Sequence, residues 1–185
     1  MKKSEIFRDS LNYIQRKIKD ILDSVSTEDI NKIKNLFFKS NRIFVYGAGR
    51  SGLVAKAFAI RLTHLGFQTF VIGETITAPV QKGDVVLIIS GSGETMPAIM
   101  TAEIARNLKA SVVSITGKKR SDVARFADIT LYISASCDDA ERKTYAPLGT
   151  LFEASVWILL DGIIADLLDS KKECEEDMRG RHATL

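Results

Sequence analysis

The feature that most constrains the fold is an alternation of short apolar runs with longer segments of helical spacing, from residue 42 to residue 168. The runs are rich in valine and isoleucine, which is typical of buried strands. Strands are expected at 42–46, 68–72, 85–89, 111–115 and 128–133, and helices at 51–65, 95–108, 121–126 and 150–168. Strands that alternate with helices form a parallel sheet covered on both faces. We therefore expect an α/β fold, a doubly wound five-stranded parallel sheet flanked by helices in a flavodoxin-like or Rossmann-like sandwich.

The two ends of the chain differ from this middle part. Apolar residues at helical spacing predict two leading helices within 1–40, which could pack on their own core or on another subunit. The stretch 171–185 is polar and is interpreted as a C-terminal tail. Because 185 residues suit one core and no linker interrupts the pattern, we expect a single domain over 1–185, with the sandwich at 42–168.

Composition excludes several classes of partner. Net charge is +3, from 26 basic and 23 acidic residues, which is too even for a nucleic-acid-binding protein. No apolar run is long enough to span a membrane, and the N-terminus lacks the pattern of a signal peptide. The two cysteines, Cys137 and Cys174, fit no metal or redox spacing. We expect free thiols, a cytoplasmic location and no nucleic-acid or membrane partner.

Two loops rich in glycine and hydroxyl side chains follow two of the strands. They are Gly47–Gly52 (G-A-G-R-S-G) and Ser90–Thr95 (S-G-S-G-E-T). Each loop comes at the carboxyl end of a strand and opens a helix, where backbone N–H groups and the helix dipole favour an anion. The hydroxyls of Ser90, Ser92 and Thr95 can donate to anionic oxygens. We interpret the loops as a phosphate cradle, with these candidate binding residues: Gly49, Arg50, Ser51, Ser90, Gly91, Ser92, Gly93, Glu94 and Thr95.

Two alternatives remain for these loops. Glycine and serine at such turns can serve the turn and the helix cap alone, although two loops in succession favour a ligand. The first loop also fits G-x-G-x-x-G, with Glu74 near the position of a ribose-binding carboxylate in a dinucleotide fold. Against that reading, the side chains of Arg50 and Ser51 stand where a pyrophosphate usually meets bare backbone. The second loop would have no role, and too few residues follow the sheet for a substrate domain.

The two loops, on successive strand–helix units, resemble those of the sugar isomerase (SIS) domain family, whose members bind phosphosugars for isomerisation or for sensing. The resemblance covers about 42–168, and within that family four further stretches are similar to the 6-phospho-3-hexuloisomerases: F-A-I-R-L-T-H-L-G-F, I-G-E-T-I-T-A-P, P-L-G-T-L-F-E and R-H-A-T-L. Thr184 stands where that family commonly has asparagine. The resemblance implies interconversion of D-arabino-hex-3-ulose 6-phosphate and fructose 6-phosphate without a metal or cofactor. It also implies a homotetramer with sites at subunit interfaces.

The same resemblance suggests which residues carry the reaction. Glu153, in the P-L-G-T-L-F-E stretch, is the expected base, although its position alone would also suit a first-turn carboxylate that stabilises its helix. His182 is the expected acid, either in its own chain or in a neighbour, unless it is a solvated tail residue. His64 is a second candidate acid, or else a C-terminal helix cap. Arg50 can steady an enediolate, and Glu94 can organise the loop.

Trp157 lies four residues after Glu153, on the same helical face, so it could form a wall of the site. Packing in the core is the interpretation that we prefer for Trp157, as for Phe67, Phe70 and Phe152.

Two other functions stay open at this point. A phosphosugar sensor of the SIS family would need the phosphate loop but neither Glu153 nor His182, and such sensors often carry a helix-turn-helix module for which 1–40 has no room. Another aldose–ketose isomerase, such as an arabinose 5-phosphate isomerase, often carries regulatory domains and a glycine-rich histidine segment that are missing here.

Overall fold

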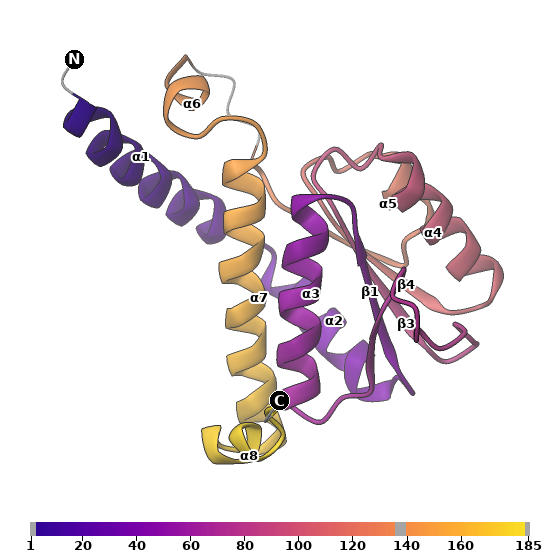
Figure 1. Cartoon of the computed structure of the whole chain (residues 1–185). Coiled ribbons are helices and arrows are strands. Elements are labelled where there is room, and N and C mark those ends of the chain that lie inside the picture. Colours follow the sequence, from indigo (N-terminus) through magenta and orange to yellow (C-terminus); the bar gives the residue numbers. More distant parts are fainter. Residues whose placement is uncertain (1–2, 136–139, 184–185) are drawn as a thin grey trace.

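The computed structural model describes residues 3–135 and 140–183 (Figure 1). Within them, five strands form one parallel sheet in the order β2-β1-β3-β4-β5. The strands are β1 (Ile43–Gly47), β2 (Thr69–Val71), β3 (Val85–Ser90), β4 (Ser111–Thr116) and β5 (Ile129–Tyr132). This order is that of the flavodoxin-like doubly wound fold, so the expected fold class is confirmed.

The centre of the sheet is its most hydrophobic part. Every residue of β3 is buried, as expected for a strand with neighbours on both sides and helices on both faces. The register pairs Leu87 of β3 with Val45 of β1 and Val113 of β4. These three side chains lie on the same face of the sheet, in the larger of two hydrophobic clusters.

Helices cover both faces of the sheet (Figure 1). The first face carries α3 (Arg50–His64) and α7 (Thr150–Lys171), packed on the cluster that contains Leu87. The second face carries α4 (Met96–Asn107) and α5 (Asp122–Phe126), packed on Phe44, Val86 and Val112. Successive strand residues point to opposite faces, and this alternation supplies both clusters.

The two leading helices belong to the first layer. They are α1 (Lys3–Asp23) and α2 (Thr27–Lys39), as expected, and the hydroxyl of Ser26 caps α2 by accepting from the amide of Asp29 at 3.2 Å. Ile33 and Phe37 of α2 are buried in the core, and the second half of α1 packs along α7. The leading helices therefore complete the chain's own core.

Two further helices are absent from the sequence-based expectation. They are α6 (Ala140–Tyr145), between the expected strand at 128–133 and the expected helix at 150–168, and α8 (Glu175–Gly180), within the expected tail. Helix α6 buries no residue, so its sequence has no apolar periodicity to detect. Helix α8 begins at a capping box in which Cys174 is the N-cap, a residue outside the usual Ser, Thr, Asp and Asn.

The expectations about the cysteines, Thr184 and membrane spans have the following outcomes. Cys137 and Thr184 lie outside the described residues. Cys174 is a free and exposed thiol. Among the helices of the described ranges, none is long and apolar enough to cross a membrane.

Strand β1 and the first turn of α3 are in direct contact. A Cβ on Gly52 would lie 2.5 Å from the carbonyl oxygen of Gly47, so no side chain fits between them. Because this contact fixes where α3 begins, it also fixes Arg50 and Ser51 at the end of the sheet.

Gly52→Ala is therefore expected to lower the free energy of unfolding by about 1–3 kcal/mol, since the extra methyl group forces α3 away from β1. Gly162→Ala is the matched control, because a Cβ on this α7 glycine has no neighbour within 4 Å. It should raise stability by about 0.5–1 kcal/mol. Urea unfolding at equal protein concentration measures both, and a Gly52→Ala protein as stable as the wild type would contradict the contact.

Candidate active site

The two phosphate-loop candidates meet at the point where the sheet reverses its winding. β1 and β3 are neighbours, but the loop after β1 leads to α3 on one face and the loop after β3 leads to α4 on the other. Such a switch point leaves a crevice at the carboxyl ends of the strands. A cavity of about 370 Å³ lies there, lined by Ala48, Ser51, Gly91, Ser92, Thr95, Gly117, Ala135, Leu148, Gly149, Phe152 and Glu153.

Three hydroxyl side chains reach this cavity, those of Ser51, Ser92 and Thr95. The hydroxyls of Ser92 and Thr95 lie 3.3 Å apart, and that of Ser92 accepts from the amide of Glu94 at 3.2 Å. Thr95 is the N-cap residue of α4, but its side chain makes no capping hydrogen bond. The arrangement offers an anion three hydroxyl donors beside a helix N-terminus.

Five candidate binding residues stand outside the cavity lining: Gly49, Arg50, Ser90, Gly93 and Glu94. The side chains of Ser90 and Glu94 hold the loop itself. Ser90 is buried, and its hydroxyl accepts from the amide of Gly93 at 3.2 Å, so it holds the loop in shape. The carboxylate of Glu94 is paired with Lys118 at 2.7 Å, which ties the loop to the segment after β4. This geometry fits an organising role for both side chains.

The first loop turns sharply into α3. Gly49 is the N-cap residue of α3 and has a φ of 56°, which favours glycine. Glu74, the carboxylate of the dinucleotide alternative, is paired with Lys56 of α3.

Glu153 lies at the boundary between this cavity and a groove. It is in the first turn of α7, its side chain is only 14% exposed, and its Oε2 is 3.4 Å from Nε of Arg50 at the start of α3. An ion pair of this length, with the arginine largely exposed, adds little stability. It does hold a cation beside Glu153, which among the described residues is the one carboxylate that lines the cavity.

The groove continues from Glu153 between α3 and α7. Its first part, of about 420 Å³, is lined by Arg50, Leu53 and Glu153 among others, and its second part, of about 310 Å³, ends at His64 and His182. Trp157 lines both parts and is 46% exposed, so the interpretation of Trp157 as a core residue is wrong. Its helical position cannot distinguish the sheet-facing side of α7 from the side beside α3.

The two histidines lie together, but far from Glu153. Their rings stack with centroids 4.8 Å apart, at the end of α3 opposite to the phosphate loops, where α8 lies in Figure 1. His64 lies fourteen positions after Arg50 in α3, which corresponds to roughly 21 Å along the helix. A single chain therefore keeps the candidate base and the candidate acids apart.

His64 is buried, at 8% exposure, and its ring packs on His182 rather than capping α3. Burial lowers the pKa of His64 below its usual value, and the positive charges of His182 and Arg61 lower it further. The charged form of His64 is therefore disfavoured by its surroundings, whereas the exposed ring of His182 faces the groove.

Several lining residues were missed from the sequence. Gly117 and Ala135 follow β4 and β5, and Leu148 and Gly149 precede α7. Their only signal is their place at the carboxyl ends of strands or next to P-L-G-T. Within the described ranges, no three His, Cys, Asp or Glu side chains gather as a metal-binding group.

The sequence pattern of the SIS domain family matches residues 36–156. The chain belongs to the SIS domain family. The match includes both phosphate-loop candidates and the first turn of α7 with Glu153, so the resemblance drawn from the sequence is confirmed.

Relatives within the SIS family extend over nearly the whole chain. A 3-hexulose-6-phosphate isomerase of Bacillus subtilis is 38% identical over 164 residues, which cover 87% of this chain and 89% of the relative. One of Methylomonas aminofaciens is 36% identical over 170 residues, which cover 91% and 94%. A crystal structure from Methanococcus jannaschii, from which a function of 3-hexulose-6-phosphate isomerase was inferred, has a TM-score of 0.86 at 31% identity, and the match covers 96% of this chain and 99% of that one.

Ser92→Ala tests the phosphate cradle. Loss of a hydroxyl donor to a charged group costs about 1.5–3 kcal/mol, so the Kd for fructose 6-phosphate and that for inorganic phosphate should both rise about 10- to 100-fold. Ser170→Ala, which removes a hydroxyl bonded to the Asp166 carbonyl near the end of α7, should leave both constants unchanged. Calorimetric titration measures them, and a change in only one of the two would show that the cradle is misassigned.

Proposed function

We propose that this SIS chain is a 6-phospho-3-hexuloisomerase, which interconverts D-arabino-hex-3-ulose 6-phosphate and fructose 6-phosphate. The observation that carries the proposal is a single cavity lined by the Glu153 carboxylate, which is only 14% exposed, and by three residues with hydroxyl side chains at a helix N-terminus. A sensor needs the donors but has no use for a base in that position. The names of the relatives support the same reaction.

In this proposal the phosphate binds to the hydroxyls of Ser51, Ser92 and Thr95 and to the N-terminus of α4. Anchoring the 6-phosphate there directs the carbons of the open-chain sugar toward Glu153. Hydroxyl donors suit this task because they can donate hydrogen bonds to the anionic oxygens of the phosphate.

Glu153 removes the proton from C2 of the 3-ketose, and the electron pair of that C–H bond forms the C2–C3 double bond of an enediolate. Negative charge then develops on O3, where the guanidinium of Arg50, 3.4 Å from Glu153, can stabilise it. Glu153 returns the proton to C3 while the hydroxyl proton moves from O2 to O3. The carbonyl has then moved to C2, with no change in atoms or electrons.

The proton transfer between oxygens needs an acid, and the histidines are the candidates that the chain offers. Because His64 and His182 lie at the far end of the groove, we propose that they act in the site of a second copy. A two-fold axis perpendicular to α3, near its midpoint at Ala57, sets His64 of one chain opposite Arg50 of the other. The same operation carries His182 to the partner's Glu153.

Exposed apolar side chains along the groove support this pairing. Leu53 and Ile60 of α3, with Trp157 and Ile158 of α7, are each close to half exposed or more. A surface of this kind that is self-complementary about a two-fold axis is expected to be an isologous interface. We propose that two such pairs form the homotetramer expected from the family.

Turnover of enzymatically made hexulose 6-phosphate to fructose 6-phosphate, with EDTA present, tests the proposed reaction, and we expect fast conversion. Glu153→Gln should lower kcat about 10²- to 10⁴-fold, with KM little changed, because it keeps the shape of the base but cannot accept a proton. Glu103→Gln, which removes an exposed carboxylate of α4, is the control. Activity retained in Glu153→Gln would remove Glu153 as the base. No conversion by the wild type, with saturable fructose 6-phosphate binding, would favour a sensor or another isomerase.

Mixing two inactive variants tests whether the site is shared. Glu153→Gln and His182→Asn chains, each inactive alone, should regain about a quarter of wild-type kcat when refolded together, since half of the dimers are hybrids and one of the two sites in each hybrid is intact. Light scattering establishes that the mixture assembles. A mixture as inactive as its parents would contradict a site built from two chains.

A further inference from the structure

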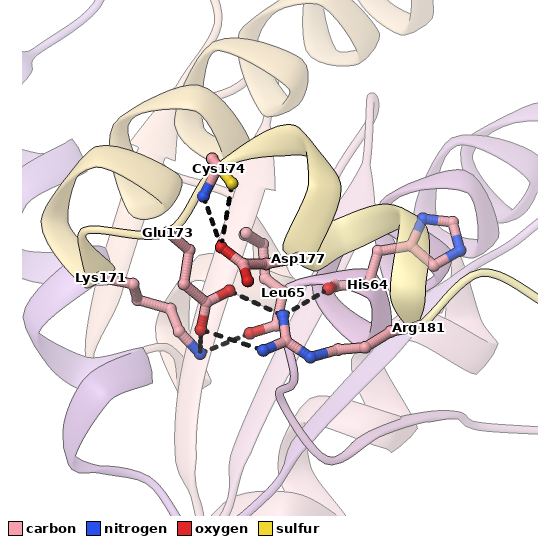
Figure 2. Close-up of polar contacts among 7 residues, drawn as sticks. All are labelled: His64, Leu65, Lys171, Glu173, Cys174, Asp177 and Arg181. Atoms are coloured by element: carbon pink, nitrogen blue, oxygen red, sulfur yellow. Dashed lines mark hydrogen bonds and ion pairs between the residues drawn. The ribbon is translucent and has the colours of Figure 1, made fainter.

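The C-terminal end of the chain folds back onto α3 through a compact cluster of charges (Figure 2). Arg181 donates from both terminal nitrogens to the carboxylate of Glu173, at 2.7 and 3.2 Å. Nζ of Lys171 lies 3.1 Å from the same carboxylate. Both cations lower the pKa of Glu173, with the hydrogen bond from Arg181 as the larger cause. We call Lys171, Glu173 and Arg181 the tail clamp.

The tail clamp holds the last carbonyl groups of α3. Arg181 donates to the carbonyl oxygen of His64 at 3.0 Å, and Lys171 donates to that of Leu65. These acceptors lie at the negative end of the helix, where cations are favourable. Gly66 follows with a φ of 79°, and a Cβ there would lie 3.4 Å from Arg181, so the chain leaves the helix directly beneath the guanidinium.

The tail clamp also joins the two ends of the short segment that contains α8. Glu173 precedes the capping box formed by Cys174 and Asp177, and Arg181 follows the last residue of α8. The Glu173–Arg181 pair therefore joins the two ends of this segment and fixes the direction in which the chain leaves it. His182 is the next residue, and its ring stacks on His64.

We propose that the tail clamp is a positioning device for the histidine pair: Arg181, held by Glu173 against the carbonyl of His64, sets the ring of His182 on the ring of His64. The catalytic part of this inference rests on the proposed function of the histidines. His182 itself is exposed, and within the part of the chain that the structure describes its ring contacts are the stack on His64 and a local hydrogen bond with the carbonyl of Ala183.

Arg181→Met removes the clamp's central group, and Arg181→Lys keeps one charged donor. In the turnover assay, Arg181→Met should lower kcat about 10- to 100-fold with KM changed less than threefold, because a misplaced acid slows the chemical step more than it weakens substrate binding. Arg181→Lys should recover part of the loss. Glu173→Gln should resemble Arg181→Met in direction, whereas Glu176→Gln, on the exposed first turn of α8, should behave as wild type.

Proton NMR separates this inference from the proposed function. The chain has 2 histidines, so untagged protein gives two sets of imidazole signals, and the stacked rings shift each other's resonances. Loss of those shifts in Arg181→Met, with correct assembly and a lower kcat, is the expected result. Unchanged shifts would overturn the positioning role, and lost shifts with an unchanged kcat would overturn the catalytic part of the inference. If the wild type does not isomerise hexulose 6-phosphate, the proposed function fails, and the ring-current shifts still test whether the clamp places His182.

Discussion

The pairing of β1 with β3 is the constraint on which the rest of the site depends. They are neighbours in the sheet, although β2 lies between them in the sequence. The chain leaves β1 toward one face of the sheet and β3 toward the other, so the starts of α3 and α4 stand side by side at one edge. That edge gains two helix N-termini and three hydroxyl groups in one cavity. Helix α7, packed beside α3, adds Glu153 at the same level. The residues of the candidate site are thus brought together by the order of the strands in the sheet and not by proximity in sequence.

Helix α3 also separates two groups of candidate site residues. Its N-terminus supplies Arg50 and Ser51, and its C-terminus carries His64 and the carbonyl groups that hold the tail. Because a helix is rigid, the two groups of residues cannot approach each other within one chain. The exposed apolar groove between α3 and α7 offers a way to join them through a second copy, which makes assembly a condition for activity in this account.

Much of this could be predicted from the sequence, for identifiable reasons. β-branched runs marked every strand, and the glycine and hydroxyl loops marked the switch point, because both signals are local. The distance between Glu153 and His182 could not be predicted, since it depends on how α7 and α8 lie against α3. The exposure of Trp157 and the roles of Lys171, Glu173 and Arg181 were missed for the same reason. In a polar tail, the sequence pattern of charged residues does not distinguish those that form ion pairs with the rest of the chain from those that are only exposed to solvent.

Exchange of hydrogen for deuterium tests the central claim most directly. Fructose 6-phosphate would be incubated with the protein in D2O and EDTA, and NMR would identify the carbon that gains deuterium. Proton transfer through a 2,3-enediolate predicts that label enters at carbon 3, and that Glu153→Gln abolishes it. Label at carbon 1 would indicate an aldose–ketose isomerase, and absence of label together with absence of conversion would contradict an isomerase built on Glu153.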